Sequence, residues 1–502
     1  MLIRSCIVTC MILLLWGGRL DAAVPFDGMV KEFRLPNGIK LLVVQRHSSP
    51  TVAAWIRYHV GSVHERSDER GIAHLLEHML FKGTRHLGTK DFTAERPILD
   101  QIERIAQRLH REKSKGRQAN QMQLRSLEKQ LKDLEKKAER YVVKDEFFEL
   151  YARHGASGYN AFTSKDSTTY LISLPSHKLE LWAAIESDRM KQPVLREFYT
   201  ERAVVMEERK RSYDAEPSAK LWESFIATAF NAHPYGQPII GWSSDIQYLT
   251  RTKAESFLKR YYAPNNATIV LVGDVQAEAA LQLVTRYFST IPAGQPVPSV
   301  PVQEEPQQGE RRVTIQGDAE TELLIGFHKT AQTDPDDVVF DMIAGVLTQG
   351  KTARLHRRLV VERQLATSVT VFDAPGQRFP NLFVIHASPR APHTSHEVEQ
   401  AIYQELAGLV TEPVSAAELN RVKNLVAYKD AQLKNSNGGL ARVLADYETV
   451  TGSWRSLQEY LPAISRVTAA DISRVASHYF TDQNRIVGIL STRRKHEANI
   501  NK

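Results

Sequence analysis

Apolar residues recur along the chain with two different periods, which predict strands and helices in turn. Short runs rich in Val, Ile and Leu predict strands at 39–44, 52–58, 168–174 and 267–274. Between them, Ile72, Leu75, Leu76 and Met79 recur at helical spacing and predict a buried helix over 71–82. This order of elements predicts an α+β fold, in which antiparallel sheets pack against helices.

The same succession recurs in the second half of the chain. Strands are predicted at 312–315, 322–328 and 486–490, and a helix at 336–348 takes the place of the helix at 71–82. Five prolines between 292 and 306 indicate an extended linker over 292–311. We therefore expect two homologous αβ domains, an N-terminal one at 24–291 and a C-terminal one at 312–502.

A polar segment at 97–144 interrupts the first domain. It carries two apolar seams at helical spacing, one of Ile98, Ile102, Ile105 and Leu109, the other of Leu124, Leu127, Leu131 and Leu134. We expect an antiparallel helical hairpin (a coiled coil) that projects from the domain as a separable insertion. A partner-docking arm, a lid, a contact for an anionic surface and a solvated decoration all remain open. Nucleic-acid binding is not expected, because no aromatic residues interleave with the basic ones.

The first 23 residues differ from the rest of the chain. Arg4 precedes an uncharged apolar run from Cys6 to Trp16, and small residues follow at Ala22 and Ala23, which predicts a cleaved signal peptide and a periplasmic protein. The run is too short for a comfortable transmembrane span, although an uncleaved N-terminal membrane anchor is the alternative. Both cysteines fall in this leader, so the mature chain would have no disulfide and no thiol ligand or nucleophile.

The size and composition of the chain fit a soluble enzyme but do not indicate a particular class of enzyme. A chain of 502 residues is too long for a single core, and 42% hydrophobic with 25% charged residues is ordinary for a globular protein. Without the leader, 63 basic residues face 57 acidic ones, so the net charge is a mild +6. Part of the excess lies in the hairpin segment, where residues 100–140 hold twelve Lys/Arg and seven Asp/Glu.

The strongest chemical signal lies on the helix at 71–82. His74, Glu77 and His78 form an H-x-x-E-H motif, and two histidines four residues apart share one helical face, where both imidazoles can reach one metal ion. Glu77 lies on the same arc, where a carboxylate can accept a proton from water activated by that metal. The motif predicts one Zn²⁺ per chain.

A helix predicted over 201–209 offers the missing third ligand. Glu201 and Glu208 are seven residues apart and fall on one stripe, which Val204 and Val205 flank as a packing face, whereas Glu207 points away. Because two turns separate the two carboxylates by about 10 Å along the helix axis, they cannot both bind the same ion. The spacing alone leaves open which of the two is the ligand.

Further segments accompany the motif along the chain. They are Leu35-Pro36-Asn37-Gly38, Asn160-Ala161-Phe162-Thr163, the Glu201/Glu208 pair and His233-Pro234-Tyr235-Gly236. Together with residues 61–84 they resemble the pitrilysin/insulinase family of zinc endopeptidases, which includes the mitochondrial processing peptidase. The resemblance implies that His74, His78 and Glu208 bind zinc, that Glu77 is the general base, and that Glu201 is a carboxylate behind the ligands that activity requires. It also makes Asn160 and Ala161 the expected contacts of a substrate held as an added strand against residues 157–163.

The resemblance also shapes expectations about assembly. Two homologous domains would form half of a clamshell chamber, so we expect a homodimer or a heterodimer with a related subunit. The second domain has no H-x-x-E-H motif and is expected to be catalytically silent. Val360 and Thr367 replace an Arg/Tyr pair that the family's second halves usually carry. The expected function is a zinc-dependent endopeptidase acting on peptides or unfolded segments; the alternative is a silent peptide-binding or assembly subunit of a two-chain processing complex.

The number of residues between the H-x-x-E-H motif and Glu208 is larger than is usual in the family that the chain resembles. His78 and Glu208 are 130 positions apart, and removing about fifty residues restores the spacing usual for this family. The hairpin segment at 97–144 accounts for that excess, so it is read as an insertion.

Overall fold

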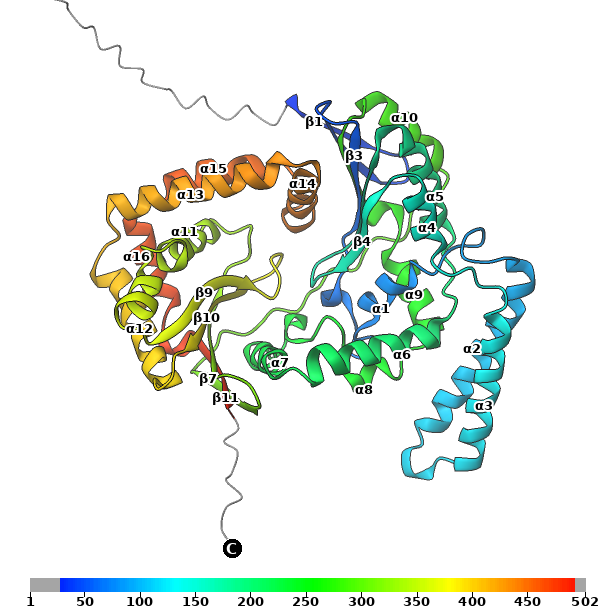
Figure 1. The fold of residues 1–502 in the computed structure, drawn as a ribbon, viewed down its shortest axis with the longest axis horizontal. Coiled ribbons are helices and arrows are strands. Elements are labelled where there is room, and N and C mark those ends of the chain that lie inside the picture. The colour runs from blue at the N-terminus through cyan, green and yellow to red at the C-terminus, as the bar shows by residue number, and fades with distance from the viewer. Residues whose placement is uncertain (1–27, 493–502) are drawn as a thin grey trace, which may run out of the picture.

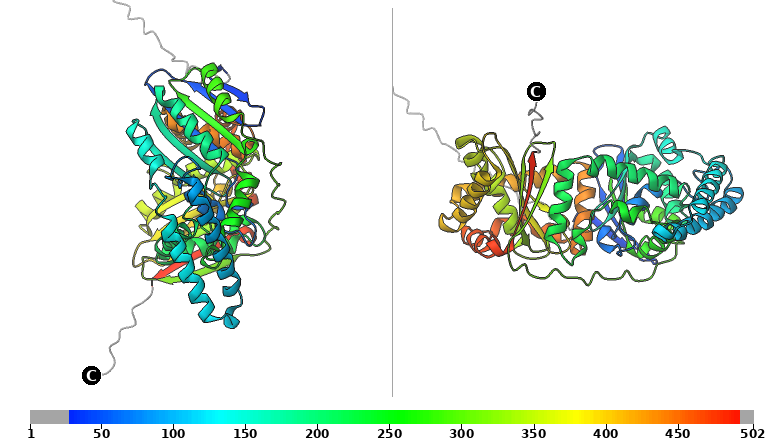
Figure 2. Two further views of the ribbon diagram at one scale, coloured as in Figure 1. Left: turned by 90° about the vertical axis from the view of Figure 1, so that its right-hand side faces the viewer. Right: turned by 90° about the horizontal axis from the view of Figure 1, so that it is seen from below.

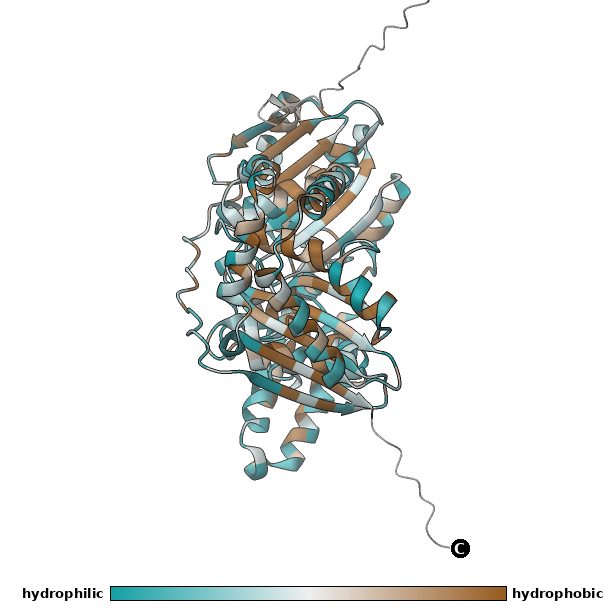
Figure 3. Ribbon diagram, turned by 90° about the vertical axis from the view of Figure 1, so that its left-hand side faces the viewer, coloured by the Kyte–Doolittle hydropathy of each residue, from teal (hydrophilic) through white to brown (hydrophobic). Residues whose placement is uncertain are grey.

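The computed structural model describes residues 28–492; the predicted signal peptide lies outside them. Two mixed sheets, one from each half of the chain, stand side by side with helices around them (Figure 1). Brown, hydrophobic strands run through both sheets in Figure 3, as expected for sheets that are buried on both faces. The α+β fold and its two-domain arrangement are thereby confirmed. The expectation of purely antiparallel sheets is wrong, because one strand pair in each sheet is parallel.

The first sheet has six strands in the order β1-β2-β6-β3-β5-β4. Their bounds are β1 Val30–Arg34, β2 Lys40–Gln45, β3 Thr51–Tyr58, β4 Ser157–Thr163, β5 Thr168–Pro175 and β6 Ala267–Gly273. The pair β2/β6 is parallel and the other pairs are antiparallel. β6 is buried along its whole length, which suits its sequence of Ala, Thr, Ile, Val and Leu. β4 forms one edge of the sheet.

The second sheet repeats this pattern with five strands in the order β7-β11-β8-β10-β9. They are β7 Arg311–Gly317, β8 Glu322–Lys329, β9 Ala366–Ala374, β10 Asn381–Pro389 and β11 Arg485–Thr492. As in the first sheet, the last strand in the chain, β11, lies between a parallel neighbour (β7) and an antiparallel one (β8). The topology therefore matches β7, β11, β8, β10 and β9 to β2, β6, β3, β5 and β4.

Sixteen α-helices lie in the described part of the chain. In the first half they are α1 Ile72–Met79, α2 Phe92–Lys113, α3 Gln121–Ala138, α4 Glu146–Arg153, α5 Leu179–Lys191, α6 Phe198–Arg209, α7 Pro217–Ala229, α8 Ser243–Ile246, α9 Arg251–Tyr261 and α10 Ala277–Phe288. In the second half they are α11 Asp337–Thr348, α12 Ser395–Thr411, α13 Ala416–Asn435, α14 Asn437–Thr451, α15 Ser456–Arg466 and α16 Ala469–Tyr479. None of these helices combines the length and the apolar character that crossing a bilayer would require.

The two halves exchange one helix each. α14 of the second half packs on the first sheet, where Leu440 and Leu444 join a cluster with Trp55 and Val270. α7 of the first half packs on the second sheet in the same way, through a cluster that contains Phe225. A Cβ placed on Gly326 of β8 would lie 2.7 Å from the Phe225 ring, so the absence of a side chain there lets the ring approach the strand. Each sheet thus completes its core with a helix from the other half.

The hairpin of α2 and α3 extends from the first half (Figures 1 and 2). Its inner turns are not separable from the domain, because Leu99, Ile102 and Ala106 belong to the main core cluster. Glu103 also accepts hydrogen bonds from the Tyr199 hydroxyl, at 2.7 Å, and from the Thr252 hydroxyl, at 2.6 Å. Only the outer turns project, which differs from the expectation that the whole of 97–144 is a separable insertion.

The predicted linker crosses between the halves as an extended chain without helix or strand from Pro292 to Glu310, along the lower side of the molecule in the right-hand view of Figure 2. Glu304 fixes part of it by accepting hydrogen bonds from the backbone N–H groups of Asn231, Ala232 and His233 at 2.8–2.9 Å.

Candidate metal centre

α1 presents its polar residues on one face because the other face is buried. Ile72, Leu75, Leu76 and Met79 are fully buried in the core of the first half, which leaves His74, Glu77 and His78 on the opposite face.

The helix begins at Gly71, which has φ 85°. A side chain there would clash, since a Cβ would lie 2.5 Å from the Ile240 carbonyl oxygen. Glu65 caps this end of α1, accepting the N–H groups of Gly71 and Ala73, each at 2.9 Å. These contacts set the direction in which the motif face points.

Three ligand-type side chains converge in front of α1. Nε2 of His74 lies 3.8 Å from Oε1 of Glu208, and Nε2 of His78 lies 3.6 Å from Oε2 of the same carboxylate. Ligands of a tetrahedral zinc ion, each about 2.0–2.2 Å from it, lie roughly 3.4 Å from one another. The ligand atoms of these three residues all lie within 4.8 Å of one another, and within residues 28–492 this is the one group of three or more His, Cys, Asp or Glu side chains that could hold a metal ion. The donor set and its spacing therefore fit Zn²⁺.

The two imidazoles differ in their surroundings. Burial lowers the pKa of His74 to about 4, so this ring is neutral near pH 7 and its Nε2 lone pair is available. Its Nδ1 is buried without a hydrogen-bond partner among the described residues. Burial alone would also lower the pKa of His78, but the hydrogen bond to Glu201 and the nearby carboxylates outweigh it and raise that pKa.

Glu201 and Glu208 lie on opposite sides of His78. Oε1 of Glu201 accepts the Nδ1–H of His78 at 2.9 Å, so that Nε2 of the ring faces Glu208. Burial by itself would raise the pKa of Glu201, but the hydrogen bonds from His78 and Lys82 prevail and lower it to about 2. Glu207 points away and pairs with Lys210 in solvent at 2.6 Å. The structure thus places Glu208, and not Glu201 or Glu207, with the two Nε2 atoms.

Glu77 contacts the edge strand β4 from the same face of α1 that carries His74 and His78. The Thr163 hydroxyl, at the end of β4, donates a hydrogen bond to Oε2 of Glu77 at 2.6 Å. Burial raises the pKa of Glu77, although this hydrogen bond acts against the rise. A carboxyl with a raised pKa is suited to accept and return a proton near neutral pH.

Asn160 and Ala161 lie on β4, whose outer edge has no strand beside it in the described structure. Asn160 is exposed, and its Oδ1 accepts the backbone N–H of Ala161 at 2.9 Å. Both residues pair with β5, and Thr163 at the end of the same strand touches Glu77. An extended peptide added along this edge would therefore lead towards Glu77.

Two residues for which sequence reasoning predicts no role contact the site: Glu65 caps α1, and Thr163 donates a hydrogen bond to Glu77. Glu65 is seven residues before the first residue of α1, and Thr163 is 86 positions from Glu77. Thr163 belongs to the segment 160–163 that resembles the family, but the contact of its hydroxyl with Glu77 depends on how β4 lies against α1. No local spacing could have indicated either contact.

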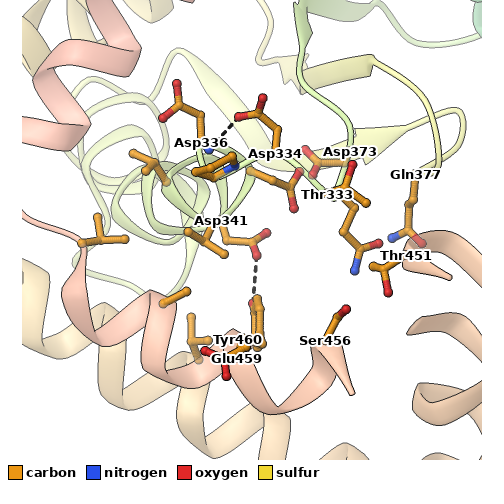
Figure 4. Close-up of a pocket in the computed structure, with 18 of the residues that line it drawn as sticks. Thr333, Asp334, Asp336, Asp341, Asp373, Gln377, Thr451, Ser456, Glu459 and Tyr460 are labelled. Carbon is orange, nitrogen blue, oxygen red and sulfur yellow. Dashed lines mark hydrogen bonds between the residues drawn. The ribbon is translucent and has the colours of Figure 1, made fainter. Parts of the chain in front are cut away.

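The second half carries an acidic cavity of about 920 Å³ between α11 and the helices α13 to α15 (Figure 4). α11 follows β8 as α1 follows β3, so the cavity lies beside the counterpart of the motif helix. Its carboxylates pair within the protein: Lys329 contacts Asp337 and Asp373, and Tyr460 donates to Asp341 at 2.8 Å. None of the residues that line it is a histidine.

Comparisons with known proteins identify the family. The family model described as "Insulinase (Peptidase family M16)" matches residues 40–109 and 134–242, and the model "Peptidase M16 inactive domain" matches residues 248–426. The chain belongs to this family of peptidases, the pitrilysin/insulinase family. Residues 110–133, which the first model does not match, include the outer turns of the hairpin.

The similar proteins include a zinc protease and solved structures of proteases. The chain is 26% identical over 456 residues to "Zinc protease PqqE" of Helicobacter pylori, a match that covers 89% of each chain. The crystal structure of a protease from Helicobacter pylori superposes with a TM-score of 0.77 at 24% identity, covering 92% of this chain and 99% of that one. The periplasmic protease PqqL from Escherichia coli superposes with a TM-score of 0.69 at 19% identity, covering 94% of this chain but 48% of that one.

Proposed function

We propose that the protein is a zinc-dependent endopeptidase that hydrolyses peptides or unfolded polypeptide segments. The observation that carries the proposal is the convergence of His74, His78 and Glu208 beside Glu77. When bound by these three residues, zinc would act as a Lewis acid that polarises a carbonyl group and lowers the pKa of water to about 7, so that the water can lose a proton and attack that carbonyl.

The remaining chemistry belongs to the protein. Glu77 accepts a proton from the attacking water and passes it to the leaving amine, with the Thr163 hydroxyl holding Oε2 of the carboxylate. Glu201 holds the Nδ1–H of His78, which leaves the Nε2 lone pair for the metal. Loss of any of these roles should lower the rate without unfolding the chain.

The substrate would bind as an added strand on β4. Main-chain hydrogen bonds along Asn160 and Ala161 would give affinity with little demand on side chains, which suits an enzyme for unfolded segments. Folded proteins have few extended segments free for such pairing, so peptides and unfolded regions are the proposed substrate class.

Assembly and location form part of the proposal. The chain matches about half of the longer PqqL, as expected if two chains of this length close one chamber; we propose a homodimer or a heterodimer with a related subunit. The absence of the Arg/Tyr pair at Val360 and Thr367 supports a contribution from a second chain. We also propose a catalytic domain at 24–291 and a silent domain at 312–502. The proposed location is the periplasm, after cleavage of residues 1–23, and the alternative is an N-terminal membrane anchor.

The replacement of Glu77 by Gln tests the mechanism. Glu77→Gln keeps the size of the side chain and can still hydrogen-bond to Thr163, but it cannot take up a proton. Zinc content should equal that of the wild type, while cleavage of an unfolded peptide, followed by mass spectrometry, should fall by about two to four orders of magnitude. Glu207→Gln, which changes an exposed glutamate on α6, is the matched control and should retain full activity.

Two outcomes would contradict the proposal. Near-wild-type cleavage by zinc-loaded Glu77→Gln would remove Glu77 from the mechanism. A wild-type chain that binds zinc but cleaves no peptide, alone or with a co-purifying partner, would favour the silent assembly subunit.

A further inference from the structure

Lys82 lies just beyond the end of α1, on the far side of Glu201 from His78. Its Nζ donates to Oε2 of Glu201 at 2.7 Å and lies 3.6 Å from Oε2 of Glu197. The other oxygen of Glu201 accepts the Nδ1–H of His78 at 2.9 Å. The Glu201 carboxylate is therefore held at both oxygens, by the imidazole on one side and by the ammonium group on the other.

The backbone at Lys82 is itself fixed by a buried arginine. Arg196, which is fully buried, donates from Nη1 to the Lys82 carbonyl at 2.7 Å and from Nη2 to the Thr84 carbonyl at 2.6 Å. Its Nε donates to Oε1 of Glu95, also fully buried, at 3.0 Å. The Lys82 side chain therefore starts from a rigid point, and its reach to Glu201 costs little conformational freedom.

Glu201 needs this second contact to hold one orientation. The Glu201 carboxylate stands on a flexible two-carbon stem, so a hydrogen bond at only one oxygen would let it rotate away from His78. Glu201 also shares α6 with Glu208, whose negative charge repels it. A partner at the other oxygen removes this freedom, and a partner with a positive charge makes the hydrogen bond stronger.

We propose that Lys82 is a positioning residue that acts through Glu201 to hold His78 with Nε2 towards the zinc ion. The inference rests on the proposed zinc site and adds a residue to it. The order of contacts is Lys82 to Glu201 to His78, and the salt bridge to Glu197, the residue preceding α6, joins the end of the motif helix to the start of the helix that carries Glu208.

The sign of the effect separates positioning from simple electrostatics. Loss of a positive charge near the site would by itself make Zn²⁺ bind more tightly, because the two cations repel each other. Loss of orientation at His78 would make Zn²⁺ bind more weakly, as happens when the partner behind a ligating histidine is removed. A weakened zinc affinity in a variant without the lysine charge therefore reports the positioning role.

The test is competition for zinc between a chromogenic chelator and the full mature chain. We expect Lys82→Met to bind zinc about 10-fold more weakly than the wild type, within the range found for partners behind metal ligands. Lys82→Arg, which keeps the charge and the donor groups, should stay within about threefold, and Lys82→Gln, which keeps a donor, should fall between the two. Lys210→Met breaks an exposed ion pair near the other end of α6 and should bind zinc like the wild type.

A double-mutant cycle tests whether Lys82 acts through Glu201. In a Glu201→Gln background the further change Lys82→Met should weaken zinc binding less than twofold, because the contact it removes is already lost. Unfolding curves recorded in EDTA show whether each variant is folded; if Lys82→Met is not, the Gln variant replaces it in the cycle.

Equal or tighter zinc binding by folded Lys82→Met or Lys82→Gln would overturn the inference while leaving the proposed zinc site intact. An undiminished effect in the Glu201→Gln background would overturn the route through Glu201. If the wild-type chain itself bound no zinc, the proposed function would fail instead, so the two failures are distinguishable.

Discussion

Zinc should stabilise the folded chain to different extents in variants of the three glutamates on α6. Glu208 lies 3.6–3.8 Å from the Nε2 atoms of both histidines, Glu201 touches only the Nδ1 side of His78, and Glu207 faces solvent. Because a ligand that binds only the folded state stabilises it, the gain measured on adding zinc reports each residue's part in binding.

The expected magnitudes follow from binding linkage. At a free zinc concentration 100 times the dissociation constant, zinc adds about 2.7 kcal/mol to the free energy of unfolding of the wild type. Glu201→Gln should weaken zinc binding by about 10- to 100-fold and so reduce the gain to roughly 1.4–0.4 kcal/mol. Glu208→Gln removes a ligand and should show no measurable gain, whereas Glu207→Gln should show the full 2.7 kcal/mol, within error.

Urea unfolding followed by tryptophan fluorescence, in zinc and in EDTA, provides the measurement. Each variant is compared with itself, so any direct effect of the substitution on the metal-free protein cancels. A gain lost in Glu207→Gln and kept in Glu208→Gln would show that the register of α6 is wrong by one residue. A complete loss in Glu201→Gln would make Glu201 a ligand and refute the assignment of Glu208 alone.

Three further outcomes are expected. Phe225→Ala removes a fully buried ring from the contact between α7 and the second sheet and should lower the free energy of unfolding by about 3–5 kcal/mol in urea titrations; a loss below about 1 kcal/mol would show that this contact is unimportant. Replacing residues 110–133 by a short Gly/Ser link should leave a folded, zinc-binding chain, whereas removing 97–144 should not; two equally soluble deletions would place the inner turns outside the core. Burial, followed by the charges of Asp337 and Asp373, raises the pKa of Asp341 from 3.8 to about 7, so the wild type loses stability as the pH rises from about 4 to 7. Asp341→Asn should therefore gain stability relative to the wild type over that range, by at most about 4 kcal/mol, and an unchanged difference between pH 5 and pH 8 would contradict the shift.

The parts of the fold that depend on local pattern could be predicted from the sequence. Predicted strands such as 52–58 and 322–328 agree with β3 and β8 to within a residue, because runs of β-branched and apolar residues are read directly. The α1 helix followed from its apolar spacing in the same way. On α6 the same reasoning was half right: Val205 is fully buried, but Val204 is 47% exposed. Adjacent residues on a helix point about 100° apart, so the apolar pattern of this short helix did not show which of the two valines is buried.

The parts that depend on distant segments could not be predicted from spacing. Glu201 and Glu208 were equivalent on the helix stripe, and only the resemblance favoured Glu208 before the structure placed it beside both Nε2 atoms. The contacts of Glu77 with Thr163 and of Glu201 with Lys82 join residues 86 and 119 positions apart. The exchange of α7 and α14 between the halves also left no local signal, since each helix is simply amphipathic.

The exchange of helices has a consequence for folding of the chain. The last strand of the first sheet ends at Gly273, but α14, which covers one face of that sheet, begins at Asn437, so 163 residues lie between them. Until α14 is in place, Leu42, Trp55 and Val270 have no helix to cover them. The first half therefore cannot complete its core alone, and a chain terminated after the first half would expose a hydrophobic sheet face to aggregation.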